Sequence, residues 1–222
     1  MTAIAIASTS GQCLPVLLKS IECYVPNDVD VYISSAFDVQ MPDRRVVCMP
    51  NTATNFGDAY NKVVKVAFME HDLLVVSNDD VVLTPTSYDK LMADYRLLSE
   101  QHKVGWVAAK CDYARPAQNI RSYKQLNGPR FQEEDWIYEC QVVAPIFGVI
   151  SRAAWQDYDP INWFSDDVQC YELVKQGYKN FVSRCYVHHV GSQTVGEDFT
   201  KCRQEAEPWL KANRPEYHKL WY

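Results

Sequence analysis

The chain has 222 residues, of which 47% are hydrophobic, and its formal net charge is −6 at pH 7. This length allows one substantial hydrophobic core, and the net acidity argues against a protein whose whole surface coats nucleic acid. The apolar runs are too short for the roughly 20 residues of a membrane helix, and the N-terminus lacks the pattern of a secretion signal. We therefore expect a soluble, cytoplasmic protein with no membrane span.

The first half of the chain alternates short runs rich in Val and Ile with segments of helical period. This pattern is typical of an α/β domain with a mainly parallel sheet. The pattern predicts strands over 3–7, 29–34, 45–49 and 72–77, and helices over 14–24 and 56–70. An acidic turn follows, and Thr84-Pro85-Thr86-Ser87 then predicts the capped start of a helix over 88–101.

The second half begins with a predicted strand over 104–109. Residues 111–135 show little periodicity and contain Arg115-Pro116 and Asn127-Gly128-Pro129, which indicates a long functional loop. A strand over 141–150, a helix over 165–176, a strand over 178–187 and a helical tail complete the prediction. We predict a domain at 1–195, with halves 1–110 and 111–195, and a C-terminal helical tail at 196–222.

The eight cysteines support the expected compartment. None forms a CxxC pair, and most lie in apolar surroundings typical of strands or helices. We therefore expect buried, free thiols in a reducing environment.

Three polar clusters follow predicted strands or begin a predicted helix. The first is Asn78-Asp79-Asp80, after a strongly apolar strand. Open α/β sheets bind ligands at the carboxyl ends of their strands, and adjacent carboxylates there favour Mg²⁺ or Mn²⁺. The alternative is a turn that caps the next helix.

The second cluster is Ser165-Asp166-Asp167, where a carboxylate can accept a proton from an attacking hydroxyl. Its alternative role is capping of the helix. The third cluster is His188-His189, after the last predicted strand, where an imidazole can join carboxylates around a divalent metal or be purely structural.

A basic, aromatic-rich run lies between the first two clusters. From residue 101 to 130 there are six basic residues and one acid, interleaved with aromatic side chains. The run either faces an anionic partner or is a solvated loop balanced by the acids at 133–135.

Taken in order, these segments resemble family 2 of the glycosyltransferases, particularly its rhamnosyltransferase-like and galactofuranosyltransferase-like members. The matching segments are Asn55-Phe56-Gly57 with Asn61 and Ala67, Ser77-Asn78-Asp79-Asp80-Val81 with Leu83-Thr84-Pro85, Gly148-Val149-Ile150-Ser151-Arg152, Phe164-Ser165-Asp166-Asp167-Val168, and His189-Val190-Gly191-Ser192-Gln193-Thr194. The second of these is similar to the family's DXD motif. The resemblance implies the GT-A fold: a Rossmann-like, mostly parallel central sheet flanked by helices, here with a short C-terminal helical appendage.

The resemblance also implies roles for individual residues. Asp80 and His189 would bind Mn²⁺ or Mg²⁺, Asp167 would be the catalytic base, and Asp166 would orient the acceptor or exchange roles with Asp167. The candidates for binding the donor are Ser8, Thr9, Ser34, Asn55, Gly57, Asn61, Asn78 and Asp79. The candidates for the acceptor are Arg115, Arg121, Lys124 and Trp163.

One position departs from the family. The family usually places a nucleoside-recognising Asp after the second strand, where this chain has Ser34-Ser35-Ala36-Phe37. Asp38, or the hydroxyl residues Ser8-Thr9-Ser10 after the first strand, are the alternatives for recognising the base.

The resemblance therefore implies an inverting, metal-dependent transfer of a sugar from a nucleoside-diphosphate sugar, with UDP favoured, to a hydroxyl acceptor. The first half of the domain would bind the donor and the second half the acceptor. The acceptor is a saccharide or, as for virus-encoded enzymes that glycosylate DNA, a hydroxylated base in nucleic acid. Two alternatives are an inactive nucleotide-sugar-binding protein and a sugar nucleotidyltransferase, although the glycine-rich phosphate loop of the latter is absent after residues 3–7.

Overall fold

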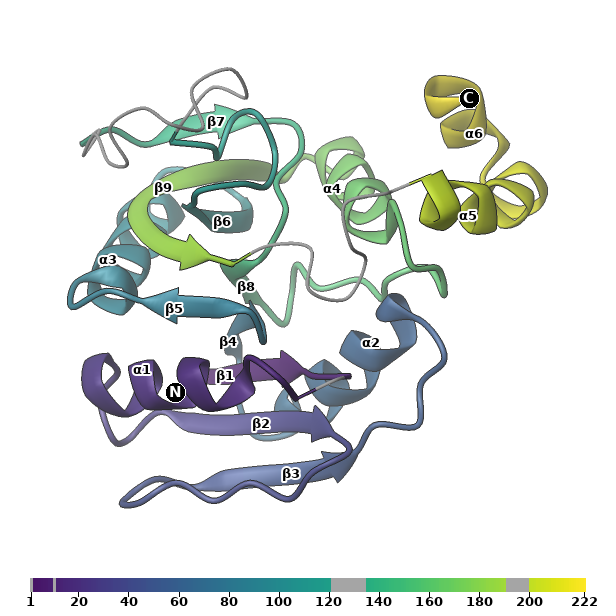
Figure 1. Cartoon of the computed structure of the whole chain (residues 1–222). Coiled ribbons are helices and arrows are strands. Elements are labelled where there is room, and N and C mark those ends of the chain that lie inside the picture. The colour runs from purple at the N-terminus through teal and green to yellow at the C-terminus, as the bar shows by residue number, and fades with distance from the viewer. Residues whose placement is uncertain (1, 10, 121–134, 191–199) are drawn as a thin grey trace.

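The computed structural model describes residues 2–9, 11–120, 135–190 and 200–222. A nine-stranded sheet crosses the molecule, with helices on both of its faces (Figure 1). The strand order is β3-β2-β1-β4-β8-β6-β9-β5, and β7 pairs with β9 outside this path.

The first half of the chain forms a parallel sheet, as the sequence pattern predicts. Strands β1 (Thr2–Ala7), β2 (Asp30–Ser35), β3 (Val46–Pro50) and β4 (Leu73–Asn78) all pair in parallel. The crossover helices are α1 (Leu14–Tyr24) and α2 (Phe56–Ala67). Helix α2 ends three residues before its predicted limit, and the other bounds agree within one residue.

The second half of the sheet is more mixed than the pattern predicted. Strand β8 (Phe147–Ser151) runs antiparallel to both β4 and β6 (Val104–Lys110), whereas β9 (Lys179–His189) runs parallel to β6. Two short strands that the sequence did not indicate, β5 (Val81–Leu83) and β7 (Tyr138–Cys140), pair antiparallel with β9.

The strand predicted over 141–150 begins only at Phe147. The backbone of Ala144 bonds instead to the buried Gln118 side chain, which donates to its carbonyl over 2.9 Å and accepts from its N–H over 2.7 Å. A side chain thus takes the place of a neighbouring strand, and an apolar run alone does not reveal this.

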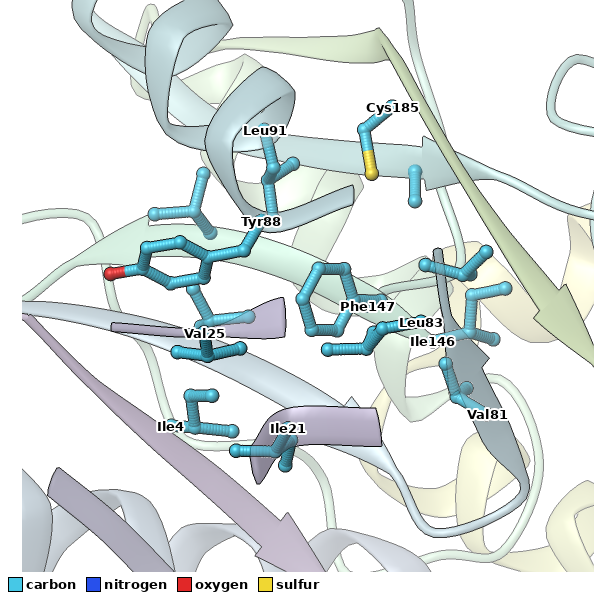
Figure 2. Packing of buried hydrophobic residues seen from close by; sticks show 14 of the residues in the cluster. Ile4, Ile21, Val25, Val81, Leu83, Tyr88, Leu91, Ile146, Phe147 and Cys185 are labelled. Atoms are coloured by element: carbon cyan, nitrogen blue, oxygen red, sulfur yellow. The ribbon is translucent and has the colours of Figure 1, made fainter. Parts of the chain in front are cut away.

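Two hydrophobic clusters cover the two faces of the sheet. On one face, α1, β5 and α3 (Ser87–Ser99) pack together, and Figure 2 shows Phe147 between Leu91 of α3 and Ile21 of α1. On the other face, α2 and α4 (Ser165–Lys175) cover residues such as Trp106. Burial of these side chains is the main stabilising contribution.

The C-terminal residues form two helices, α5 (Thr200–Asn213) and α6 (Pro215–Trp221), which lie beside α4 (Figure 1). Their buried residues join the segment before α4 in a third cluster, whose buried members are Ile161, Phe164, Val168, Ala206, Leu210 and Tyr217. The tail is therefore helical, as predicted, and it packs against the main body.

All eight cysteines are free thiols. Only Cys111, Cys170 and Cys185 are buried, and Cys23 is exposed. The prediction of free thiols is confirmed, but the expectation that most of them are buried is wrong. Among the described helices, none is long and apolar enough to cross a membrane.

Candidate active site

The sheet topology brings the ends of six strands to one edge. Because β8 is antiparallel to both β4 and β6, these two strands run in the same direction, and β1, β2, β3 and β9 run with them. A pocket of about 570 Å³ opens at this edge. Residues that follow these strands line it: Thr9 after β1, Asn51 after β3, Asn78, Asp79 and Asp80 at the end of β4, Tyr113 and Arg115 after β6, and His189 at the end of β9.

Asp80 and His189 face each other because β5 pairs with the end of β9. The backbone N–H of Val190 donates to the carbonyl of Asp80 over 3.0 Å, and His189 Nε2 lies 3.3 Å from Asp80 Oδ1. The other ring nitrogen of His189, Nδ1, lies 2.6 Å from the carbonyl oxygen of Tyr113. Burial lowers the pKa of His189. The hydrogen bond with Asp80, together with the other hydrogen bonds of the ring, outweighs the effect of burial and raises the pKa to about 10.

Asp79 is held by a residue after β1. Ser8 Oγ donates to Asp79 Oδ2 over 2.6 Å, and Asn51 Nδ2 donates to the Ser8 carbonyl over 3.1 Å. Burial raises the pKa of the Asp79 carboxyl, against the hydrogen bond from Ser8. Because α3 begins only at Ser87, neither Asp79 nor Asp80 caps a helix.

These side chains fit a divalent cation. Carboxylate oxygen and imidazole nitrogen are ligands of Mn²⁺, and a metal-bound histidine usually donates its other ring N–H to a carbonyl or carboxylate. His189 has this arrangement, with Nδ1 on the Tyr113 carbonyl and Nε2 toward Asp80. A second acid and histidine group, Asp30, Glu70 and His71, is at the opposite edge of the sheet.

That second group is an ion-pair cluster. Arg45 lies 3.0 Å from Asp30 Oδ2 and 2.5 Å from Glu70 Oε2, so its guanidinium already neutralises both carboxylates. We assign it no metal.

The acid pair at the start of α4 lies at the pocket. Phe164 is the N-cap of α4, so Asp166 and Asp167 lie in the first turn and neither is the cap. Arg115 Nη2 lies 3.4 Å from Asp166 Oδ2 and forms a short ion pair with Asp167. Asp166 lines the pocket, whereas Asp167 is only 6% exposed.

The pair is electrostatically coupled. Burial and the neighbouring Asp166 raise the pKa of Asp167 to about 7, although Arg115 opposes both. A carboxylate with this pKa is suited to general base catalysis near neutral pH.

Of three residues of the α2 region that were predicted to bind the donor, two contact the segment before α4. Asn55 lines the pocket and caps α2, because its side chain accepts the N–H of Asp58 over 2.8 Å. Asn61 exchanges two hydrogen bonds with the Tyr158 backbone, of 2.8 and 2.7 Å. A Cβ on Gly57 would lie 2.0 Å from the Asp159 carbonyl oxygen. The geometry gives Gly57 and Asn61 a structural role.

The remaining donor candidates also include both pocket-lining residues and buried residues. Thr9 and Asn78 line the pocket. Ser8 is buried, and its hydroxyl donates a hydrogen bond to Asp79. Ser34 is fully buried, and its hydroxyl has no hydrogen-bond partner among the residues that the structure describes. The structure therefore does not bring Ser34 to the pocket surface.

Of the acceptor candidates, Arg115 and Trp163 line the pocket. Arg121 and Lys124 lie outside the described residues. Sequence reasoning missed Asn51, Tyr113 and Asn162, which also line the pocket. The position of Asn51 after β3 and of Tyr113 after β6 was a usable signal, because strand ends at one edge form the ligand site.

No family model matches this sequence, and no curated protein matches it by sequence. The structure of GalNAc-T7 with UDP, GalNAc and Mn²⁺ is similar, with a TM-score of 0.63 and 13% identity over 85% of this chain and 43% of that chain. The structure of TarS 1–349 from S. aureus has a TM-score of 0.56 and 13% identity over 98% of this chain and 68% of that chain. This chain thus spans less than half of GalNAc-T7. The fold is GT-A, with a central sheet flanked by helices.

Proposed function

We propose that this chain is a metal-dependent glycosyltransferase that moves a sugar from a nucleoside-diphosphate sugar to a hydroxyl acceptor. One arrangement carries the proposal: Asp79, Asp80 and His189 line the same pocket as Asp166 and Arg115, at the carboxyl edge of a GT-A sheet. The similar GalNAc-T7 structure contains UDP, GalNAc and Mn²⁺, which supports a UDP-sugar as the donor here.

Asp80 and His189 would hold Mn²⁺ or Mg²⁺, with Asp79 assisting or contacting the ribose. Such a cation, when bound, neutralises charge on a departing diphosphate. Ser8 orients the Asp79 carboxylate, and the Tyr113 carbonyl orients the His189 ring. The first contact comes from a buried residue and the second from the backbone, so the site is preorganised.

The carboxylate pair of α4 would receive the proton of the acceptor hydroxyl in a single displacement that inverts the anomeric carbon. The family resemblance gives this role to Asp167, whereas the pocket gives access to Asp166. We propose that the two act as one coupled unit with Arg115 as their common counter-ion. The isosteric single variants Asp166→Asn and Asp167→Asn separate their contributions.

A saccharide is the acceptor that the described residues favour over nucleic acid. Of the six basic residues in 101–130, three are described, and all three have internal partners. Lys103 donates to the Gln176 carbonyl over 3.0 Å, Lys110 is 4% exposed, and Arg115 pairs with the acids of α4. Trp163 and Tyr113 line the pocket, and a sugar ring can pack on aromatic side chains of this kind.

The experiment that tests this function is a donor screen with Mn²⁺ that follows release of nucleoside diphosphate by mass spectrometry. We expect the wild type to hydrolyse or transfer at least one UDP-sugar, and Asp80→Asn to lose this activity. Wild-type protein that binds UDP with Mn²⁺ but releases no sugar from any donor would overturn the proposal.

One observation favours an inactive nucleotide-sugar-binding protein as the second candidate. Arg115 covers both acids of α4, so neither carboxylate is free of a counter-ion. The same screen decides between the two, because a binding protein would be stabilised by donor and Mn²⁺ without consuming the donor.

A further inference from the structure

The segment that leads into α4, residues 158–164, is held from the donor side by α2. Asn61 binds the backbone of Tyr158 through two hydrogen bonds, of 2.8 and 2.7 Å. The N–H of Phe56 donates to Asn162 Oδ1 over 2.9 Å. We call residues 158–164 the α4 leader, because α4, with Asp166 and Asp167 in its first turn, follows it directly.

The C-terminal helices hold the α4 leader from the opposite side. Arg214 donates to both carboxylate oxygens of Asp159, over 3.1 and 3.0 Å, and Asp159 is 8% exposed. Trp221 stacks on Phe164 with ring centroids 4.3 Å apart and planes at 6°. The Tyr222 ring makes an edge-on contact with the same Phe164 ring, and the two ring centroids are 6.2 Å apart.

The Phe164 backbone needs such support. Its φ is 72°, in the left-handed region that a non-glycine residue rarely adopts, and its side chain makes no cap hydrogen bond to α4. Such strain persists only where surrounding contacts determine the conformation. The stacked ring of Trp221 supplies that contact, because the Phe164 side chain is 9% exposed between α4 and α6.

We propose that α5 and α6 are a positioning element of the active site. By fixing Phe164 and Asp159, they set where the first turn of α4 begins, and hence where Asp166 and Asp167 stand relative to the metal residues across the pocket. Trp221 and Arg214 are thus positioning residues that touch neither donor nor acceptor. The kinetic consequence of this inference rests on the proposed glycosyl transfer. Its structural consequence rests only on the contacts of the α4 leader.

The test compares Trp221→Ala with the conservative variant Trp221→Phe and the control Leu220→Ala. Leu220 is the preceding residue of α6 and is 58% exposed, so its truncation shortens an apolar side chain of the same helix without touching Phe164. We expect Trp221→Ala to lower the kcat of transfer about tenfold or more, since a small misplacement of a base is costly. The affinity for UDP with Mn²⁺ should change less than about twofold, and Trp221→Phe should recover most of the rate.

Backbone hydrogen exchange supplies a readout that needs no activity. In Trp221→Ala, the amides of 162–168 should exchange faster than in the wild type, while those of β1 and β4 stay protected. Unchanged exchange at 162–168 would overturn the inference, as would a parallel loss of donor affinity and kcat. If the wild type transfers no sugar at all, the proposed function fails, and the exchange result still decides the inference.

Discussion

Replacing Asp167 with Asn is expected to stabilise the folded protein at pH 8 while it removes glycosyl transfer. Asp167 is 6% exposed and its carboxyl stands beside Asp166, and these two effects raise its pKa from 3.8 to about 7. A group whose pKa is higher in the folded state stabilises that state most when it is protonated. Its contribution is therefore complete below pH 3.8 and is lost as the pH rises to about 7.

The size of the effect follows from the shift. Each pKa unit corresponds to about 1.4 kcal/mol, so a shift of about three units sets an upper limit of about 4 kcal/mol at pH 8. At pH 5 only about 1 to 2 kcal/mol of this cost is present, since the pH lies about one unit above 3.8. The stability gain of Asp167→Asn over the wild type should thus grow by about 2 to 3 kcal/mol between pH 5 and pH 8.

Urea unfolding of both proteins at the two pH values measures this difference. The control is Asp72→Asn, because the Asp72 side chain is 85% exposed and the same substitution there should leave the free energy of unfolding nearly unchanged at both pH values. If Asp167→Asn gains no more stability at pH 8 than at pH 5, the charge of Asp167 is not costly in the folded state and the reasoning is refuted.

Three further predictions concern other parts of the molecule. Asp80→Asn should abolish the rise in melting temperature that UDP and Mn²⁺ together give the wild type, and a full rise in the variant would count against Asp80 as a ligand. Gly57→Ala should cost about 2 kcal/mol or more, seen as a lower urea midpoint, because its Cβ would lie 2.0 Å from the Asp159 carbonyl oxygen. Asp94→Ala should cost about 3 to 5 kcal/mol, since Asp94 is fully buried and accepts hydrogen bonds from Arg184 Nε and Nη2 over 2.9 and 2.6 Å; a midpoint within error of the wild type would contradict this.

The parallel half of the fold could be predicted from the sequence because local pattern determines it. Strand β4 is an apolar run that ends in acids, and α1 has a helical period with a proline in its first turn. Strand β5 could not be predicted in this way. It has three residues, and it forms because β9 offers a partner, from Val81 with His189 to Leu83 with Val187.

In the candidate site, too, local sequence pattern predicted some features, whereas others depend on contacts between distant segments. Asp79 and Asp80 could be found because they follow a strong strand, but the approach of His189 to Asp80 depends on the pairing of β5 with β9. The pairing of Arg115 with both acids of α4 joins residues about 50 positions apart in the chain, and no local pattern encodes it. Gly57 and Asn61 show the converse: a motif indicated donor contacts, whereas both residues support the α4 leader.

The most direct test of the central claim is the release of UDP from a panel of UDP-sugars by the wild type and by Asp80→Asn, each with Mn²⁺ and with EDTA. We predict that the wild type consumes at least one donor with Mn²⁺ only, and that Asp80→Asn consumes none under either condition. Equal turnover of that donor in EDTA, or in the Asp80→Asn variant, would contradict a metal-dependent transferase centred on Asp80 and His189.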